Sequence, residues 1–368
     1  MLLLVLFVFA ACSEPVITPV RDEVLFRQQS FPDLVFVNFD AEDLVLLGSA
    51  SGFPETRVLD PTVYQSQNVS TGDTNGDGVD DIIIGSSNNH LSYVAGFDGA
   101  FSLVNAPTSV DSYDSRLADM DGDGDLDAVF AGVGPTNVYV NPGDGQLTGG
   151  TGWSNTMTNT FGLAVGDLNG NGLPDIVHAD NNNGLGSGLR WLENVGGSFD
   201  PEVDIQAPLQ FFEDVAVGDM DNDGDVDIIT ARGGDPALLF INNGPATFNV
   251  SPETIDSSNP TAFAVELGDL NNDGFVDIVF ATSTINRRVM NNGDGTFDGG
   301  ANIGSMSASS QDLALADFNL DGNLDVAFAN SGTSNVVHYG NGDGSFAAKV
   351  IVDTSTSTTN GVGVGNFD

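Results

Sequence analysis

The clearest chemical signal in the sequence is a nine-residue loop pattern, D-x-[DN]-x-[DN]-G-x-x-D, which recurs six times. Its first, third, fifth and ninth positions carry side-chain oxygens, and alternate positions of a tight loop can point at one centre. Glycine at the sixth position permits a sharp bend, after which the seventh carbonyl can turn inward. Ca²⁺ takes roughly six to eight oxygen ligands with flexible geometry. The spacing therefore predicts one calcium site per loop, about six sites in all.

Each predicted site adds the backbone carbonyl of the seventh position to the four side chains. In chain order, the expected ligand residues are Asp73, Asn75, Asp77, Val79 and Asp81; Asp119, Asp121, Asp123, Asp125 and Asp127; Asp167, Asn169, Asn171, Leu173 and Asp175; Asp219, Asp221, Asp223, Asp225 and Asp227; Asp269, Asn271, Asp273, Phe275 and Asp277; and Asp317, Asn319, Asp321, Asn323 and Asp325. The loops contain no cysteine or histidine, which disfavours zinc, copper and iron. A cage rich in protein oxygens suits Ca²⁺ better than Mg²⁺.

The carboxylate count ranks the six predicted sites. The loops that begin at Asp119 and Asp219 carry four ligand carboxylates each, so we expect them to bind Ca²⁺ most tightly. The loop that begins at Asp167 carries two and is expected to bind most weakly. A solvated acidic turn without metal is the alternative for a single copy. Six copies with the same glycine and the same closing aspartate argue against it.

Extended segments surround every loop. A short alternating segment such as 163–166 precedes the loop, and an apolar segment such as 128–131 follows it. About twenty residues later comes a Gly-rich turn with an aromatic residue, as at 291–297. Such turns are typical hairpin connections, so each copy holds about four short strands. The period and the strand content are those of one β-propeller blade.

The two ends of the repeat region decide the expected blade count. Residues 34–52 contain the same unit with a shortened loop, and residues 361–368 match the first strand of another copy. The sequence thus predicts an all-β, seven-bladed β-propeller, with eight blades as the alternative. Two explanations are open for the final strand: it completes the first blade and closes the ring, or the sequence is a fragment of a longer protein.

The repeats resemble a known family. Stretches such as "GDTNGDGVDDIIIG" from Gly72 and "GDLNNDGFVDIVFAT" from Gly268 are similar to the FG-GAP/VCBS-type repeat of integrin α-subunit propellers and of many bacterial surface proteins. The resemblance covers residues 34–368. It implies a seven-bladed propeller in which a calcium loop joins the first two strands of a blade. The shortened loop at 38–43 departs from the pattern, so no metal is implied there.

The N-terminus has the features of a targeting segment. Residues 1–11 form an apolar run that is too short for a transmembrane helix and ends in small residues before Cys12. Cys12 is the only cysteine of the chain, and the "FAAC" ending resembles a bacterial lipoprotein signal with a lipid anchor on this residue. A plain cleaved secretory signal is the alternative. The expected organisation is a signal at 1–11, a linker at 12–32 and the propeller at 33–368, in a secreted or surface-anchored outer-membrane lipoprotein.

The charge balance limits the possible partners. The chain carries 52 acidic and nine basic residues, for a net charge of −43. This excludes electrostatic binding to nucleic acid or to an anionic membrane surface, and leaves the membrane only through an anchor at Cys12. Solubility in salty surroundings and coordination of hard cations are the ordinary uses of such an acidic surplus.

Residues that could serve catalysis are few and scattered. The candidates are His90, His178, His338, Trp153, Trp191 and the pair Arg287–Arg288. The histidines lie in or beside predicted strands, away from any nucleophile motif, and we expect structural roles for them. The tryptophans are expected to serve packing or carbohydrate stacking, and the arginine pair is expected on a solvated turn.

Two functional hypotheses follow. The first is a non-catalytic, calcium-stabilised binding or adhesion module that recognises a protein or glycan through loops on one face. The second is a calcium-dependent polysaccharide lyase or hydrolase, which would need acid and base residues near the channel. One module of a larger protein is compatible with either. The sequence does not name the ligand, because fold does not determine function.

Overall fold

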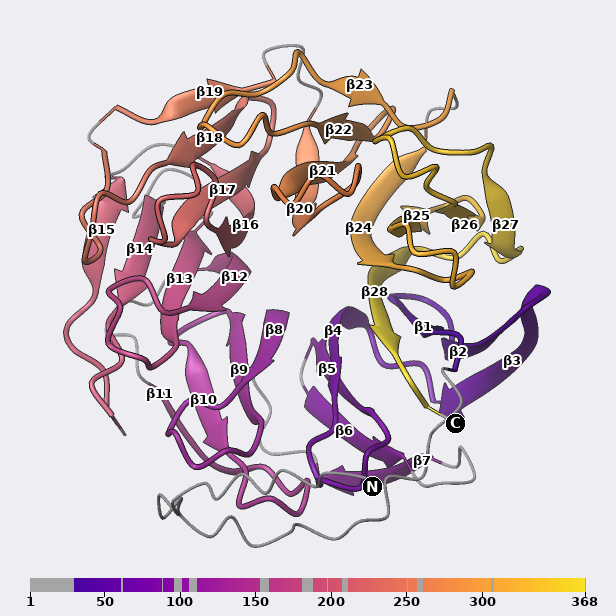
Figure 1. Ribbon diagram of the computed structural model, residues 1–368. Coiled ribbons are helices and arrows are strands. Elements are labelled where there is room, and N and C mark those ends of the chain that lie inside the picture. The colour runs from indigo at the N-terminus through magenta and orange to yellow at the C-terminus, as the bar shows by residue number, and fades with distance from the viewer. Residues whose placement is uncertain are drawn as a thin grey trace, which may run out of the picture. The chain divides into compact units, whose positions relative to one another are not determined.

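The computed structural model describes residues 30–60, 62–87, 89–95, 101–105, 111–152, 159–180, 188–196, 198–206, 211–249, 251–256, 261–305 and 308–367. Within the compact unit Phe31–Asp368, these residues form an all-β β-propeller (Figure 1). The expected signal segment, Cys12 and most of the expected linker lie outside the described residues. The described part of the chain contains no helix that is long and apolar enough to cross a membrane.

The described residues form seven four-stranded antiparallel sheets. Six of the sheets take their strands in chain order from the centre of the ring outward. They are β4 (Ser66–Gly72), β5 (Asp81–Ser86), β6 (Asn89–Ala95) and β7 (Phe101–Asn105); β8 (Ser112–Ala118), β9 (Asp127–Gly132), β10 (Asn137–Val140) and β11 (Thr148–Gly152); β12 (Thr160–Gly166), β13 (Asp175–Asp180), β14 (Gly188–Leu192) and β15 (Val203–Gln206); β16 (Phe212–Gly218), β17 (Asp227–Arg232), β18 (Ala237–Phe240) and β19 (Glu253–Ile255); β20 (Ala262–Gly268), β21 (Asp277–Thr282), β22 (Arg287–Val289) and β23 (Ala301–Asn302); and β24 (Ser309–Ala316), β25 (Asp325–Ser331), β26 (Asn335–His338) and β27 (Val350–Asp353).

The remaining sheet joins the two ends of the repeat region. Its strand order is β28 (Thr359–Gly365), β1 (Asp33–Asn38), β2 (Asp43–Ser49) and β3 (Gly52–Asp60). Strand β28 pairs antiparallel with β1, and Leu34 lies opposite Val364. The innermost strands β4, β8, β12, β16, β20, β24 and β28 each pack against the next one, so they surround a central channel (Figure 1). The final strand therefore closes the ring, which is one of the two predicted explanations.

The second strand of each sheet supplies most of the core. Every residue of β1, β5, β9, β13, β17 and β21 is buried, as is all of β25 except its last residue. These runs are rich in Val, Ile, Ala and Phe because neighbouring sheets cover both of their faces. Trp191 of β14, for example, packs in one cluster with Phe212 and Phe240 from the next sheet. Packing and carbohydrate stacking were both predicted as possible roles for the tryptophans, and Trp191 serves packing.

Candidate metal loops and the central channel

The six acidic loops occupy equivalent places in the propeller. Each joins the first and second strands of its sheet, as β16 and β17 are joined by residues 219–226. Hydrogen bonds from the hairpin of one sheet reach the acidic loop of the preceding sheet, so the loops gather at one edge of the ring.

The loops share one hydrogen-bonding pattern, which the first aspartate organises. In the loop at Asp219, Oδ1 accepts the N–H of the fifth residue at 3.1 Å and Oδ2 that of the sixth residue at 3.0 Å. Each of the other five loops repeats both bonds. The first carboxylate therefore fixes the bend even without an ion.

The bend needs two left-handed residues, of which the sequence pattern signalled one. The sixth position is glycine in all six loops, with φ between 84° and 97°. The fourth position also has positive φ, and in three loops it is not glycine: Asn222 (61°), Asn272 (60°) and Leu320 (58°). A leucine in this region is disfavoured by its side chain, so the surrounding hydrogen bonds must impose the conformation.

Two of the loops bring three carboxylates together. Oxygens of Asp119, Asp121 and Asp127 lie within 4.8 Å of one another, and so do those of Asp219, Asp221 and Asp227. These are the two loops that the sequence ranks highest. In the second group, Oδ1 of Asp221 is buried and has no hydrogen-bond partner. A buried oxygen without a partner is costly unless a ligand satisfies it, so this donor set fits a hard cation.

The ninth aspartate has a second role that sequence analysis missed. It is fully buried in all six loops. In Asp227, Oδ2 accepts the N–H of Met220 at 2.8 Å, and Oδ1 accepts the N–H of Asn242 at 2.7 Å. Burial raises the pKa of Asp227 to about 7, while the two backbone bonds oppose this shift. The side chain thus ties the loop to the hairpin that follows the third strand.

Asparagines on that hairpin connect neighbouring sheets. The Nδ2 group of Asn242 donates to the carbonyl of Leu168 in the preceding loop at 2.8 Å and to that of Val226 in its own loop at 3.1 Å. Equivalent paired bonds come from Asn141, Asn194 and Asn291. The sequence signal was an asparagine directly before the Gly-rich turn, which sequence analysis treated only as part of a hairpin.

The closing sheet contains the same junction in two pieces. The N–H of Phe367 donates to Oδ2 of Asp33 at 2.8 Å, and the N–H of Gly48 donates to Oδ1 at 2.7 Å. Asp33 therefore stands where the ninth aspartate stands in the six complete loops. The shortened loop has a different closure, because the N–H of Asn38 bonds Oδ1 of Asp43 at 2.7 Å.

Other residues singled out in the sequence serve the fold. His178 is buried between Thr136 and Glu202, with contacts of 3.0 and 3.1 Å. In His338, Nδ1 lies 3.0 Å from the carbonyl of Ala347. Both support the structural role expected for the histidines. The side chains of His90 and Trp153 lie outside the described residues.

The arginine pair is placed differently from the prediction. Arg287 and Arg288 lie on strand β22, where Arg287 pairs with Asp256 at 2.6 Å and Arg288 pairs with Asp298. The prediction of a solvated turn was wrong. It weighed the basic pair as exposed charge and did not foresee acidic partners from neighbouring segments.

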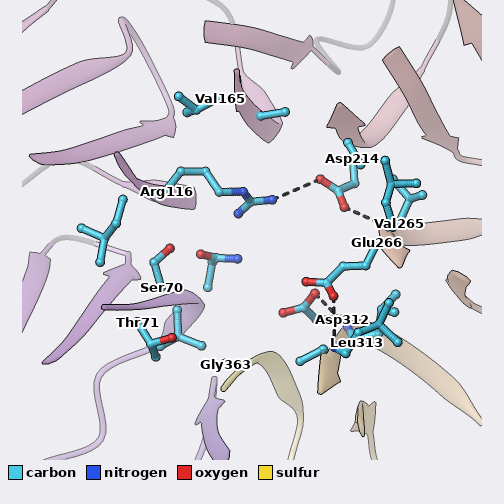
Figure 2. A pocket seen from close by; sticks show the side chains of 18 of the residues that line it. Ser70, Thr71, Arg116, Val165, Asp214, Val265, Glu266, Asp312, Leu313 and Gly363 are labelled. Carbon is cyan, nitrogen blue, oxygen red and sulfur yellow. Dashed lines mark hydrogen bonds and ion pairs between the residues drawn. The ribbon is translucent and has the colours of Figure 1, made fainter. Parts of the chain in front are cut away.

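The central channel holds a second set of charged residues. It encloses a cavity of about 590 Å³ (Figure 2). Arg116 pairs with Asp114 at 2.5 Å and reaches towards Asp214 at 3.8 Å, while Glu266 and Asp312 lie beside each other on the opposite wall. Burial is the main cause that raises the pKa of Asp114 and of Asp312 to about 7 and that of Glu266 to about 8.

Acidic and amide side chains in the channel also join neighbouring innermost strands. Four of them, each five residues before a loop or its counterpart, accept a backbone N–H from the next strand. The bonds run from Ser115 to Asn68 (3.2 Å), from Leu163 to Asp114 (2.7 Å), from Val265 to Asp214 (2.9 Å) and from Val362 to Asp312 (2.9 Å).

Small residues occupy this position in the intervening sheets. A Cβ on Gly162 would lie 2.4 Å from Cα of Asp214, so the close approach of the next strand requires glycine there. Acid and small residue then alternate around the ring. Seven sheets cannot complete a strict alternation, and two polar residues, Asn68 and Asp114, become neighbours where it fails. The first of these is the neutral one.

Several solved structures of differently described proteins are similar in fold to this chain. An Agrocybe aegerita lectin, described for specific recognition of non-reducing terminal N-acetylglucosamine, has a TM-score of 0.66 and 19% identity, covering 92% of this chain and 96% of its own. BBS1N in complex with ARL6DN has a TM-score of 0.55 and 10% identity, covering 81% and 87%. Sqt1 of Saccharomyces cerevisiae has a TM-score of 0.53 and 12% identity, covering 87% and 81%. At these identities the likeness shows the fold alone.

Two further comparisons concern the sequence. None of the curated proteins matches the chain. The model of the FG-GAP-like repeat matches residues 85–178, 219–280 and 269–328, together more than half of the chain. The matched ranges include five complete acidic loops, and the loop at Asp119 is matched together with both of its flanking strands. The chain therefore belongs to the FG-GAP-like repeat family and is an all-β β-propeller.

Proposed function

We propose that this protein is a calcium-stabilised binding module without catalytic activity, which works outside the cell or anchored at its surface. The observation that carries the proposal is the convergence of three carboxylates within 4.8 Å in each of two equivalent loops. In one of them Asp221 presents a buried oxygen without a hydrogen-bond partner. Ca²⁺ would satisfy this oxygen and offset the repulsion between the carboxylates.

Calcium in the loops would act on the stability of the ring. The loop backbone already has its bend, and the ninth aspartate already joins each loop to a hairpin. The asparagine bonds then connect one loop to the next around the same edge. An ion bound in one loop would therefore reinforce a network that spans several sheets, which supports a structural role for the metal.

The ligand would be a protein or a glycan. Similarity of fold to a lectin supports the glycan alternative, although it does not transfer that protein's specificity. A cavity of about 380 Å³ between the sheets β20–β23 and β24–β27 is a candidate site. Asn286, Asn330, His338 and Lys349 are among its lining residues and could hydrogen-bond to hydroxyl groups.

Surface anchoring through Cys12 remains a prediction from the sequence. Metabolic labelling with a radioactive fatty acid, followed by fractionation of the cells, would test it. Label on the wild-type chain and none on a Cys12→Ser variant would support the lipid anchor. Cleavage of a signal without lipid on either chain would support ordinary secretion.

One experiment addresses the metal and the ligand together. The protein with Ca²⁺ and the protein with EDTA are applied to an array of glycans and matrix proteins, while calorimetry counts the calcium sites. We expect about six sites and calcium-dependent retention of a ligand that is not chemically changed. No calcium binding in the calorimeter would refute the proposal, and release of cleaved glycan would favour the lyase or hydrolase.

A further inference from the structure

The wall of the central channel departs from the symmetry of the ring at one level. This level lies three residues before the first residue of each loop, or before its counterpart in the closing sheet. Five of the seven sheets have serine, alanine or glycine there, and the other two have Arg116 and Glu266. Small residues leave the cavity open, while two opposite charges stand far enough apart that they form no ion pair within 4.0 Å among the described residues.

The basic and the acidic side of the cavity differ in their ion-pair partners. Arg116 has Asp114 and Asp214 as partners. Glu266 accepts the N–H of Leu315 at 3.1 Å, and Asp312 accepts the N–H of Val362 at 2.9 Å. Within the described part of the chain, neither of these two carboxylates has a basic group within 4.0 Å. Their mutual repulsion contributes to the raised pKa of Glu266.

The space beside these carboxylates suits an organic cation better than a metal ion. The cavity measures about 590 Å³, which is within the range of small-molecule sites. Val217, Leu267 and Leu315 line it on the side towards the loops and offer an apolar surface. Among the described residues, the groups of three acidic side chains that converge within 4.8 Å lie in two loops, and neither contains a channel carboxylate.

A second group of residues lies at the edge opposite the loops. Each innermost strand has a register irregularity beside one residue, six positions before the loop or its counterpart. Bulges of this kind re-aim a side chain, and three of the seven residues are aromatic: Tyr113, Phe161 and Phe263. They line a second cavity of about 310 Å³, which shares Asn68, Arg116, Asp214 and Asp312 with the channel. Aromatic faces next to carboxylates are a favourable path for a cation.

We propose that the central channel binds an alkylammonium group on an apolar stem, with the ammonium beside Glu266 and Asp312 and the stem against Leu267 and Leu315. The group has two sources, a free amine of lysine size or a lysine side chain of a partner protein. Charge complementarity selects it, because the channel has more carboxylates than arginines. Binding here is separate from the calcium loops and from any ligand on the outer surface.

The test is calorimetry on the calcium-saturated full chain with Nα-acetyl-lysine amide as the probe. Nα-acetyl-norleucine amide has a similar stem without the charge and is the matched control ligand. We expect at least tenfold tighter binding of the lysine compound. We also expect Glu266→Gln to weaken it by at least tenfold, and Glu253→Gln, an exposed carboxylate on β19, to leave it unchanged. Circular dichroism and the calcium count verify that each variant is folded.

Several outcomes would overturn the proposal. Equal affinity for the two ligands, or an unchanged affinity in Glu266→Gln, would show that the channel carboxylates do not recognise the ammonium. Loss of one calcium site in Glu266→Gln would show that a metal occupies the channel instead. If binding occurs, a decapeptide with one lysine distinguishes the sources: tighter binding than the free compound indicates a partner protein, and equal or weaker binding indicates a free amine. Asp221→Asn, which weakens the proposed loop site, should leave the channel affinity unchanged, so either proposal can fail alone.

Discussion

Carboxylates cluster in two regions of this propeller, and the two clusters differ in which parts of the chain supply them. At the loop edge, Asp219, Asp221 and Asp227 come from one nine-residue segment and lie within 4.8 Å of one another. In the channel, Asp214, Glu266 and Asp312 come from three strands, and each bonds a backbone N–H of the next innermost strand. Adjacent positions in one loop can surround an ion. Two positions of the innermost strand, repeated around a ring, place their charges around a space.

The number of acidic residues in a region is therefore a poor guide to their role. The ninth aspartate belongs to both patterns, since it is a predicted ligand and also accepts two backbone bonds. Its loss should therefore act on the fold even where no metal is bound. Glu266 of the channel should behave differently when replaced by glutamine, because this change removes a buried charge and keeps an oxygen for the bonded N–H of Leu315.

The largest effect is expected from removing calcium. A site held at a hundredfold above its Kd contributes about 2.7 kcal/mol to the free energy of unfolding. With about six sites, we expect EDTA to lower the Tm by more than roughly 10 °C relative to the calcium-saturated protein. Differential scanning calorimetry measures the shift, and excess CaCl₂ should reverse it. An unchanged Tm would show that calcium in the loops does not stabilise the fold.

The next effect concerns the ninth aspartate. Asp227→Ala leaves the buried N–H groups of Met220 and Asn242 without their partner, so we expect a loss of about 2–5 kcal/mol in unfolding free energy. Because the bonds exist without metal, much of this loss should persist in EDTA. Urea unfolding with and without EDTA measures it.

The matched control for this prediction is Asp225→Ala, two positions earlier in the same loop. The expected contribution of Asp225 to the metal is its backbone carbonyl, so this variant should change stability by less than about 1 kcal/mol. Equal losses in the two variants would show that the two backbone bonds of Asp227 add nothing to stability. A loss for Asp227→Ala that vanishes in EDTA would show that this aspartate acts only through the ion.

The loop-and-strand architecture was accessible from the sequence because it repeats. Six copies of one pattern predict the tight acidic loop, and the apolar run after each copy predicts the buried second strand. The same logic identified the degenerate first repeat and the final strand, but it left open whether they share a sheet, and the structure pairs them. Repetition averages out local ambiguity, so that a pattern that is weak in one copy becomes specific in six.

Contacts between distant segments were not accessible in the same way. The role of Asp33 depends on Phe367, which lies at the other end of the chain. Arg116 belongs to the channel only because seven innermost strands surround a common space. In the sequence it stands alone on a short strand, and nothing local distinguishes it from a surface arginine. Such roles arise only when distant segments of the chain pack together, so the local sequence pattern does not indicate them.

The pH dependence of stability should isolate the contribution of Glu266 in the channel. The pKa of Glu266 rises from an ordinary 4.5 to about 8 in the folded protein. The folded state therefore holds the proton more tightly than the unfolded state, and stability falls as pH increases from about 4.5 to about 8. Glu266→Gln removes this term and keeps an oxygen for the N–H of Leu315. We expect the variant to be more stable than wild type by about 1–3 kcal/mol at pH 9 and similar to it at pH 4.

Urea unfolding across this pH range, in saturating calcium, is the measurement. Asp114, Asp214, Asp312 and the buried ninth aspartates of the loops, such as Asp227, also have a raised pKa. The pH dependence should therefore become shallower without disappearing. The exposed Glu253→Gln variant provides the control and should follow the wild-type curve. A variant that is less stable than wild type at pH 9 would show that the Glu266 charge supports the fold.

The smallest effect tests the ranking of the loops themselves. The loop at Asp167 has two ligand carboxylates, and Asn171→Asp adds a third at the fifth position. Added charge should strengthen calcium binding at this weakest site by about tenfold, or about 1.4 kcal/mol. The gain is limited because Nδ2 of Asn171 now donates to the carbonyl of Asn194 at 2.9 Å, a bond that aspartate cannot make. Calorimetric titration should show the weakest class of sites becoming tighter, whereas Asn292→Asp, on an exposed turn, should leave the isotherm unchanged. If this ranking is right, the loop at Asp167 binds calcium less tightly than those at Asp119 and Asp219. Equal affinities would show that the shared backbone geometry, and not the number of carboxylates, sets the calcium affinity of these loops.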